Sequence, residues 1–117
     1  MMRHFLPFAA LAALLPVAAH AEDESARALA EKRLRGCLAA GASSAPGGTL
    51  AAAIASARAF CGPQINTVAD YRVEAATQGL EGEAAEEVKA RTLRTLNNEI
   101  AHAVANFTGL AHQHAAH

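Results

Sequence analysis

The sequence predicts an all-α, single-domain protein: a small three-helix bundle whose second helix is long and kinked near Pro63, with one disulfide between Cys37 and Cys61. Three observations lead to this prediction. Apolar residues recur every three or four positions along three segments, which Gly- and Pro-rich stretches separate. Alanine, the strongest helix former, dominates the composition. The chain has only two cysteines and begins like an exported protein, in which paired cysteines are normally oxidised.

Residues 1–21 have the layout of a cleaved secretory signal. A short polar start is followed by an apolar run over residues 5–19, and Ala19 and Ala21 are the small residues that a signal peptidase reads. The run is shorter than the about 20 residues that span a membrane. We therefore expect cleavage before Glu22, a periplasmic or secreted location, and no membrane span after cleavage.

The rest of the chain is long enough for one domain. Arg3 is the only Lys or Arg of the leader, so the mature chain has nine Lys and Arg residues and eleven Asp and Glu residues. This slightly acidic net charge argues against a protein that binds nucleic acid and against a polybasic membrane anchor. Large apolar residues are few, which predicts a thin hydrophobic core. We assign residues 22–111 to the helical domain and residues 112–117 to a flexible tail that contains histidines.

The first expected helix runs from Asp23 to Ala40. Acidic residues lead it and basic residues gather toward its end, an order that the helix dipole favours. Gly41 is the expected stop, and a loop rich in Gly and Ser follows.

The second expected helix opens at Thr49, a good N-cap residue, and ends near Gly79. Its apolar stripe keeps the same phase on both sides of Gly62-Pro63, where proline disturbs the backbone hydrogen bonds. We therefore expect one kinked helix, with two separate helices as the alternative. The disulfide requires the first helix to pass close to the kink, and we expect Gly36 and Gly62 to permit that approach.

The third expected helix starts in the acidic run that contains Glu81, and Gly109, which follows Thr108, is its expected C-cap. Its apolar residues are three and four positions apart, which is typical of a helix-packing seam. The large residues of this seam, which we predict to serve as an interaction surface, are Leu93, Leu96, Ile100, Phe107 and Leu110.

The tail holds the one cluster with the character of a metal site, formed by His112, His114 and His117. Imidazole binds copper, nickel and zinc, so one hypothesis is that the tail weakly binds a divalent transition metal. The alternative hypothesis is an exposed tail that binds no specific metal. The sequence contains no Gly-x-Ser-x-Gly elbow, no His-Glu-x-x-His motif and no phosphate-binding glycine loop. We therefore expect no enzymatic activity and no other cofactor.

These features together favour a small exported helical protein that binds an unknown protein partner or a second copy of itself. A stress-related or chaperone-like component of the cell envelope fits this description. The alternative is a metal-binding or metal-buffering protein that uses the histidine tail. Small helical acid-stress chaperones of the periplasm share the size and the single disulfide, but their cysteine spacing differs, so they provide an analogy of function only.

Overall fold

Four α-helices make up the part of the chain that the structure describes. The computed structural model describes residues 6–43 and 48–109, with side chains from residue 22 onward. The helices are α1 (Leu6–Ser43), α2 (Leu50–Phe60), α3 (Gly62–Thr77) and α4 (Gly82–Thr108). No strand occurs among these residues, and the all-α prediction is confirmed.

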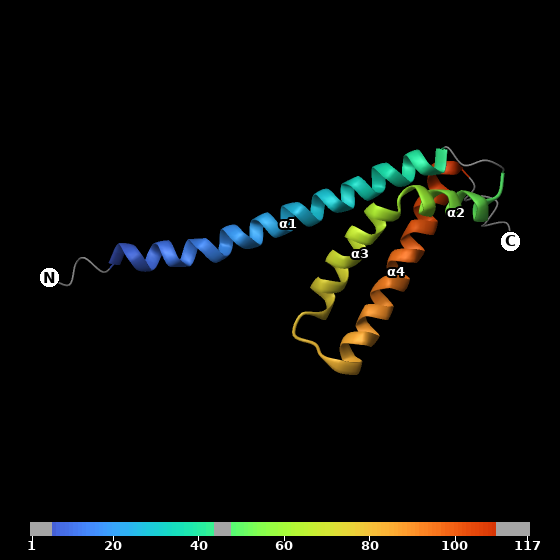
Figure 1. Ribbon diagram of the computed structural model, residues 1–117. Coiled ribbons are helices and arrows are strands. Elements are labelled where there is room, and N and C mark those ends of the chain that lie inside the picture. Colours follow the sequence, from blue (N-terminus) through green and yellow to red (C-terminus); the bar gives the residue numbers. More distant parts are fainter. Residues whose placement is uncertain (1–5, 44–47, 110–117) are drawn as a thin grey trace.

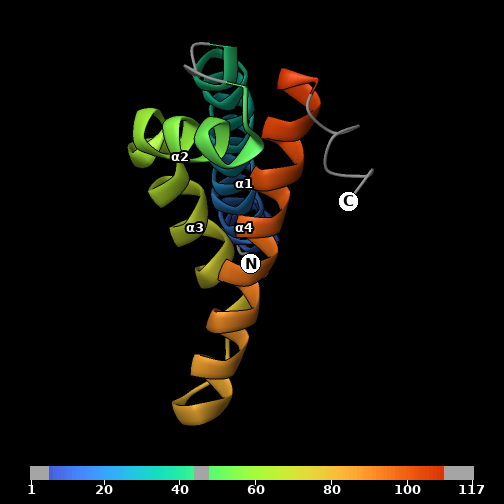
Figure 2. The same ribbon diagram turned by 90° about the vertical axis from the view of Figure 1, so that its right-hand side faces the viewer.

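The helices are arranged as a hairpin with two helices packed at one of its ends. α3 and α4 run antiparallel, and the C-terminal part of α1 crosses them at the end away from their connecting turn (Figure 1). The short α2 lies crosswise to α3 and α4 (Figure 2). α1 contacts each of the other three helices, so it holds the bundle together.

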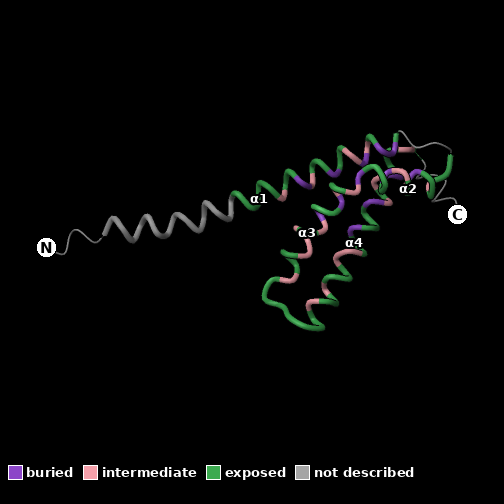
Figure 3. Tube along the Cα trace, in the orientation of Figure 1, coloured by how far each residue is buried: buried purple, intermediate pink, exposed green. Residues whose placement is uncertain are grey.

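The hydrophobic core sits where the four helices meet, and the turn between α3 and α4 lies outside it (Figure 3). The largest fully buried side chains are Ile100, Val68, Val104 and Cys61. Alanines fill much of the remaining core, which brings the helix backbones close together and leaves little apolar area to bury. The buried residues are Ala30, Leu34, Leu38, Ala42, Ala53, Ala57, Cys61, Ile65, Val68, Leu96, Ile100, Val104 and Ala105.

The second predicted helix is in fact two helices, so the described bundle has four helices and the prediction of three was wrong. Cys61 alone separates α2 from α3, with φ −105° and ψ 18°. Pro63 lies in the first turn of α3, where the missing N–H leaves no hydrogen bond unmade. The Cys61 N–H still donates to the Ala57 carbonyl, and the Ile65 N–H donates to the Cys61 carbonyl, both at 2.9 Å. These two bonds keep the apolar stripe in phase while the helix axis turns.

The predicted helix ends are confirmed at two positions and displaced at α1. The Ala52 N–H donates to the Thr49 hydroxyl oxygen at 3.2 Å, so Thr49 caps α2. Gly109 ends α4 in the left-handed region, with φ 73°. α1 begins before the predicted Asp23 and continues past Ala40, because the alanine-rich sequence on both sides also favours helix.

The close backbone approach between α1 and α2 occurs at Gly41, which is buried, and the expectation for Gly36 and Gly62 was wrong. A Cβ atom on Gly41 would lie 3.2 Å from the Ala57 Cα atom and 3.2 Å from Cδ1 of Phe60. A Cβ atom on Gly36 or Gly62 would meet nothing within 4 Å. Gly41 is therefore a packing residue inside α1 rather than the residue that ends it.

Two substitutions in α1 should separate these roles. Gly36→Ala is expected to raise the free energy of unfolding by about 0.5–1 kcal/mol, because alanine favours the helix and the site is open. Gly41→Leu is expected to lower it by about 1–3 kcal/mol, because the added atoms press against the backbone of α2. Urea denaturation followed by circular dichroism measures both values, and equal stability of the two variants would contradict the assignment.

Candidate binding cleft between α1 and α3

The predicted interaction seam on α4 is divided between the core and the surface. Leu96 and Ile100 are buried, Leu93 is half-buried and Phe107 is 45 % exposed. Leu110 lies outside the described residues. Val104, which the seam did not include, is fully buried instead. The buried residues Leu96, Ile100 and Val104 are four positions apart, so the buried face of α4 leaves the heptad line before Phe107.

The histidines of the predicted metal site, His112, His114 and His117, lie outside the described residues. Within residues 22–43 and 48–109, no group of three His, Cys, Asp or Glu side chains is placed to hold a metal ion. The metal site therefore stays a prediction of the sequence.

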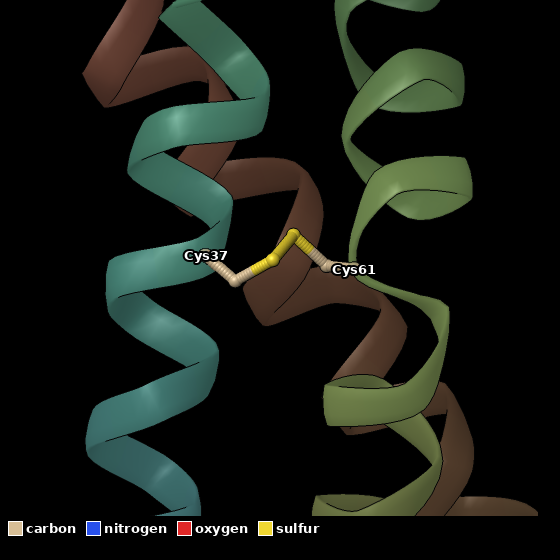
Figure 4. The surroundings of a disulfide bond; sticks show 2 residues. All are labelled: Cys37 and Cys61. Atoms are coloured by element: carbon tan, nitrogen blue, oxygen red, sulfur yellow. A yellow bond between two sulfur atoms is a disulfide. The ribbon is translucent and has the colours of Figure 1, made fainter.

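The predicted disulfide is present in the structure. Cys37 of α1 joins Cys61 at the junction of α2 and α3, with 5.8 Å between their Cα atoms (Figure 4). Cys61 is completely buried and Cys37 is half-buried. The bond therefore ties α1 to the point where the chain turns, and its position indicates a structural role.

Sequence reasoning missed an ion-pair network that links three helices. Arg72 of α3 donates from Nε to Glu31 Oε1 at 2.8 Å and from Nη2 to Glu31 Oε2 at 3.0 Å, a two-pronged pair between α3 and α1. Its Nη1 also donates to Glu99 of α4. Arg72 borders the apolar stripe of α3, where a charged side chain needs a partner, but Glu31 is 41 residues away in the sequence.

The network stabilises the charged form of Glu31. The hydrogen bond from Arg72 is the main cause that lowers the pKa of Glu31 below its ordinary value of 4.5, and the nearby charges of Arg72 and Arg35 lower it further. Partial burial of the carboxylate acts in the opposite direction. Hydrogen bonding to Glu31 in turn raises the pKa of Arg72, so that its guanidinium stays charged.

A lowered carboxylate pKa predicts a loss of stability in acid. The contribution of Glu31 is present above the unfolded-state value near 4.5 and is lost as the pH falls through the lower pKa of the folded state. We expect Glu31→Gln to lower the free energy of unfolding at pH 7 by about 0.5–1 kcal/mol, and we expect this difference to shrink as the pH falls below 4.5. Glu74→Gln, an exposed change on α3, is the control and should show no such pH dependence. If Glu74→Gln differed from wild type in stability with the same pH dependence as Glu31→Gln, the effect could not be assigned to the ionisation of Glu31.

Three surface clefts border α1 in the described part of the chain, and the two larger ones differ in charge. The smallest, of about 140 Å³, adjoins the cleft between α1 and α3 and is lined by Asp23, Arg27 and Glu74. The cleft between α1 and α4 has a volume of about 220 Å³ and a floor of core leucines. Arg72 lines it and is paired with both Glu31 and Glu99, and Arg35 adds a second positive charge. The charged groups at this cleft are therefore already balanced.

The cleft between α1 and α3 is larger, about 340 Å³, and its polar groups are not paired in the same way. Arg33 is the only charged residue in its lining, and it takes part in none of the ion pairs among the described residues. Gln64 places its side-chain oxygen in a buried position where no described group donates to it. Thr67 is the third polar residue of the lining. The apolar part of the lining is formed by Ala26, Leu29, Ala30, Pro63 and Tyr71.

This arrangement defines a shallow cleft with an apolar wall and one exposed positive charge. The Gln64 side-chain oxygen lies beneath the surface of the cleft, because that atom is buried. Its volume lies at the lower end of the range of ligand pockets. Leu29 lines this cleft and is 45 % exposed. The cleft can bind an apolar group that carries its own polar atoms.

Comparison of the chain with protein-family models, with curated proteins and with solved structures finds no match. Across the helices that the structure describes, none combines the length and the apolar character needed to cross a membrane.

Proposed function

We propose that this protein is a small exported helical protein that binds a protein partner without catalysing a reaction, in the manner of a stress-related or chaperone-like component of the cell envelope. The observation that carries the proposal is the cleft between α1 and α3, which combines exposed Leu29 with an uncompensated charge on Arg33. A hollow lined mainly by apolar side chains with a few polar groups is the usual form of a binding site.

Photocrosslinking tests whether this cleft meets a partner. A photoreactive phenylalanine derivative at Leu29 should give a discrete crosslinked adduct in the native cell envelope. The same group at Leu80, which is 39 % exposed at the turn between α3 and α4, is the matched control and should give none. Equal labelling from both positions, or none from Leu29, would count against the proposal.

Export is supported by the leader-like residues 1–21 and by the disulfide. The described core residues of α1 begin at Ala30, so cleavage before Glu22 leaves all of them in place. It also makes Glu22, Asp23 and Glu24 the start of the helix, where negative charge is favourable. Mass spectrometry of the native protein should find Glu22 at the amino terminus and no free thiol before reduction. An intact leader would contradict export.

Metal binding by the tail is the alternative that the histidine spacing supports. Titration calorimetry with zinc or copper compares the mature protein with a chain that ends at Ala111. A specific tail site requires that the shortened chain lose most of the affinity. Equal affinity of the two chains would eliminate the tail.

A further inference from the structure

We propose that Cys37 is the site at which a low-molecular-weight thiol exchanges with the disulfide, and that Cys61 is the cysteine that closes the bond again. The reacting group of the thiol is its thiolate. The proposal needs no protein partner, so it is independent of the proposed function. Three features of the bond lead to it.

The two sulfur atoms differ in access to solvent. Cys61 is 0 % exposed and belongs to the core cluster that contains Ile100 and Val104 of α4. α4 passes behind the bond, which bridges α1 and the junction of α2 and α3 (Figure 4). Cys37 keeps part of its surface in solvent, although it packs against the same core. Because exchange requires direct attack on a sulfur atom, Cys37 is the one sulfur of the pair that a thiol can reach in the folded protein.

The neighbours of Cys37 on α1 leave room for a small molecule. Gly36 is exposed, and a Cβ atom there would meet nothing within 4 Å. Ala40, which lies about one turn further along the helix, is exposed and has a side chain of one carbon. These two residues therefore place no large side chain over Cys37.

The fold also stabilises the sulfur that leaves. Cys61 is the N-cap residue of α3, and no described side chain caps this helix with a hydrogen bond in the disulfide form. Pro63 has no N–H, so Gly62 and Gln64 supply the N–H groups of this first turn. Their partial positive charge favours a thiolate at the start of the helix and opposes the cost of a buried charge. Cys61 can therefore leave as a thiolate and attack again later.

Exchange at Cys37 proceeds without an oxidant. The thiolate attacks Cys37 Sγ, the bond between the two Sγ atoms breaks, and its electron pair moves to Cys61 Sγ, which takes a proton from water. A mixed disulfide then occupies Cys37, and α1 is no longer tied to the junction of α2 and α3. In the reverse step the Cys61 thiolate attacks Cys37 Sγ and expels the small thiol. The disulfide is thus a redox-sensitive tie that opens and closes through Cys37.

Peptide mapping after a short reaction tests the inference on the oxidised mature protein. Native protein is mixed with reduced glutathione, and the reaction is stopped with N-ethylmaleimide in acidic urea before digestion without reduction. Glutathione should be found on Cys37 and the maleimide on Cys61. Glutathione on Cys61, or no adduct unless urea is present during the reaction, would overturn the inference.

Two single-cysteine variants measure the difference in access directly. Cys61→Ala leaves Cys37 as the one thiol, Cys37→Ala leaves Cys61, and neither variant can form the internal bond. Cys37 should react with glutathione disulfide about 10–100-fold faster than Cys61, because Cys61 reacts only after local opening of the core. The two rates should converge in urea. Circular dichroism shows whether both variants remain helical, and equal rates in the folded variants would overturn the inference.

Thioredoxin, a protein dithiol, provides the comparison of size. Reduction of the bond by thioredoxin but not by glutathione would assign the exchange to a protein surface and overturn the choice of a small thiol. Crosslinking at Leu29 does not involve the disulfide, so failure of the exchange experiments would leave the proposed function as it stands.

Discussion

Reduction of the disulfide is expected to destabilise the bundle by about 3 kcal/mol, because the bond closes a loop of 24 residues in the unfolded chain. For a domain of this size such a change lowers the melting temperature by roughly 12–24 °C. The effect should be large relative to the total stability, since the core contains few large side chains. Thermal unfolding followed by circular dichroism, with and without a phosphine reductant, measures the shift.

A variant in which Cys37 and Cys61 are both alanine is the control for the reductant. Its melting temperature should lie at or below that of the reduced wild-type protein and should not respond to further reductant. Cys61 is 0 % exposed, so part of the loss in this variant comes from packing at that site. Identical melting of oxidised and reduced wild type would show that the bond does not stabilise the fold.

Truncation of Ile100 is expected to have the second large effect. Ile100 is 1 % exposed and is among the largest fully buried side chains, so Ile100→Ala removes apolar contacts and leaves a cavity where α4 meets the other helices. We expect the free energy of unfolding to fall by about 2–5 kcal/mol. Denaturation in urea, analysed with a two-state model, gives this value.

Phe107→Ala is the matched comparison on the same helix. Both residues belong to the predicted seam, but Phe107 is 45 % exposed in the structure. Its truncation should cost less than about 1 kcal/mol, because much of the ring is already in water. If the two substitutions cost the same, the buried face of α4 would follow the heptad line and not the line through Leu96, Ile100 and Val104.

The ends of the helices could be predicted where a local chemical signal exists. Thr49 caps α2 because its hydroxyl reaches the Ala52 N–H, a contact within one turn. Gly109 ends α4 because it adopts a positive φ that other residues avoid. Such interactions span three or four residues, so the sequence contains all the information that they need.

The break at Cys61 could not be predicted in the same way. The apolar stripe has the same phase in a kinked helix and in two helices joined by a pair of shared hydrogen bonds. The choice depends on how far the axis turns, and that depends on the packing of α2 across α1 at Gly41. Sequence periodicity reports which residues face the core, but it does not report the angle between successive helices.

The cleft and the ion-pair network were not predictable for a related reason. Arg33 and Gln64 come from different helices, and so do Arg72 and Glu31. Nothing in the spacing of these residues indicates that they meet. Their only common signal is a polar or charged residue next to an apolar stripe, and many solvent-exposed residues share it.

The sequence by itself determined the all-α class, the caps of α2 and α4, and the pairing of the only two cysteines. The tertiary structure decided that the helices number four in the described part of the chain, that Gly41 is the point of close approach, and that Arg72 joins three helices. The physical reason is the range of the interactions. Helix formation and capping act within a turn of the backbone, whereas crossing angles arise from side chains of separate helices that must fit one another in space.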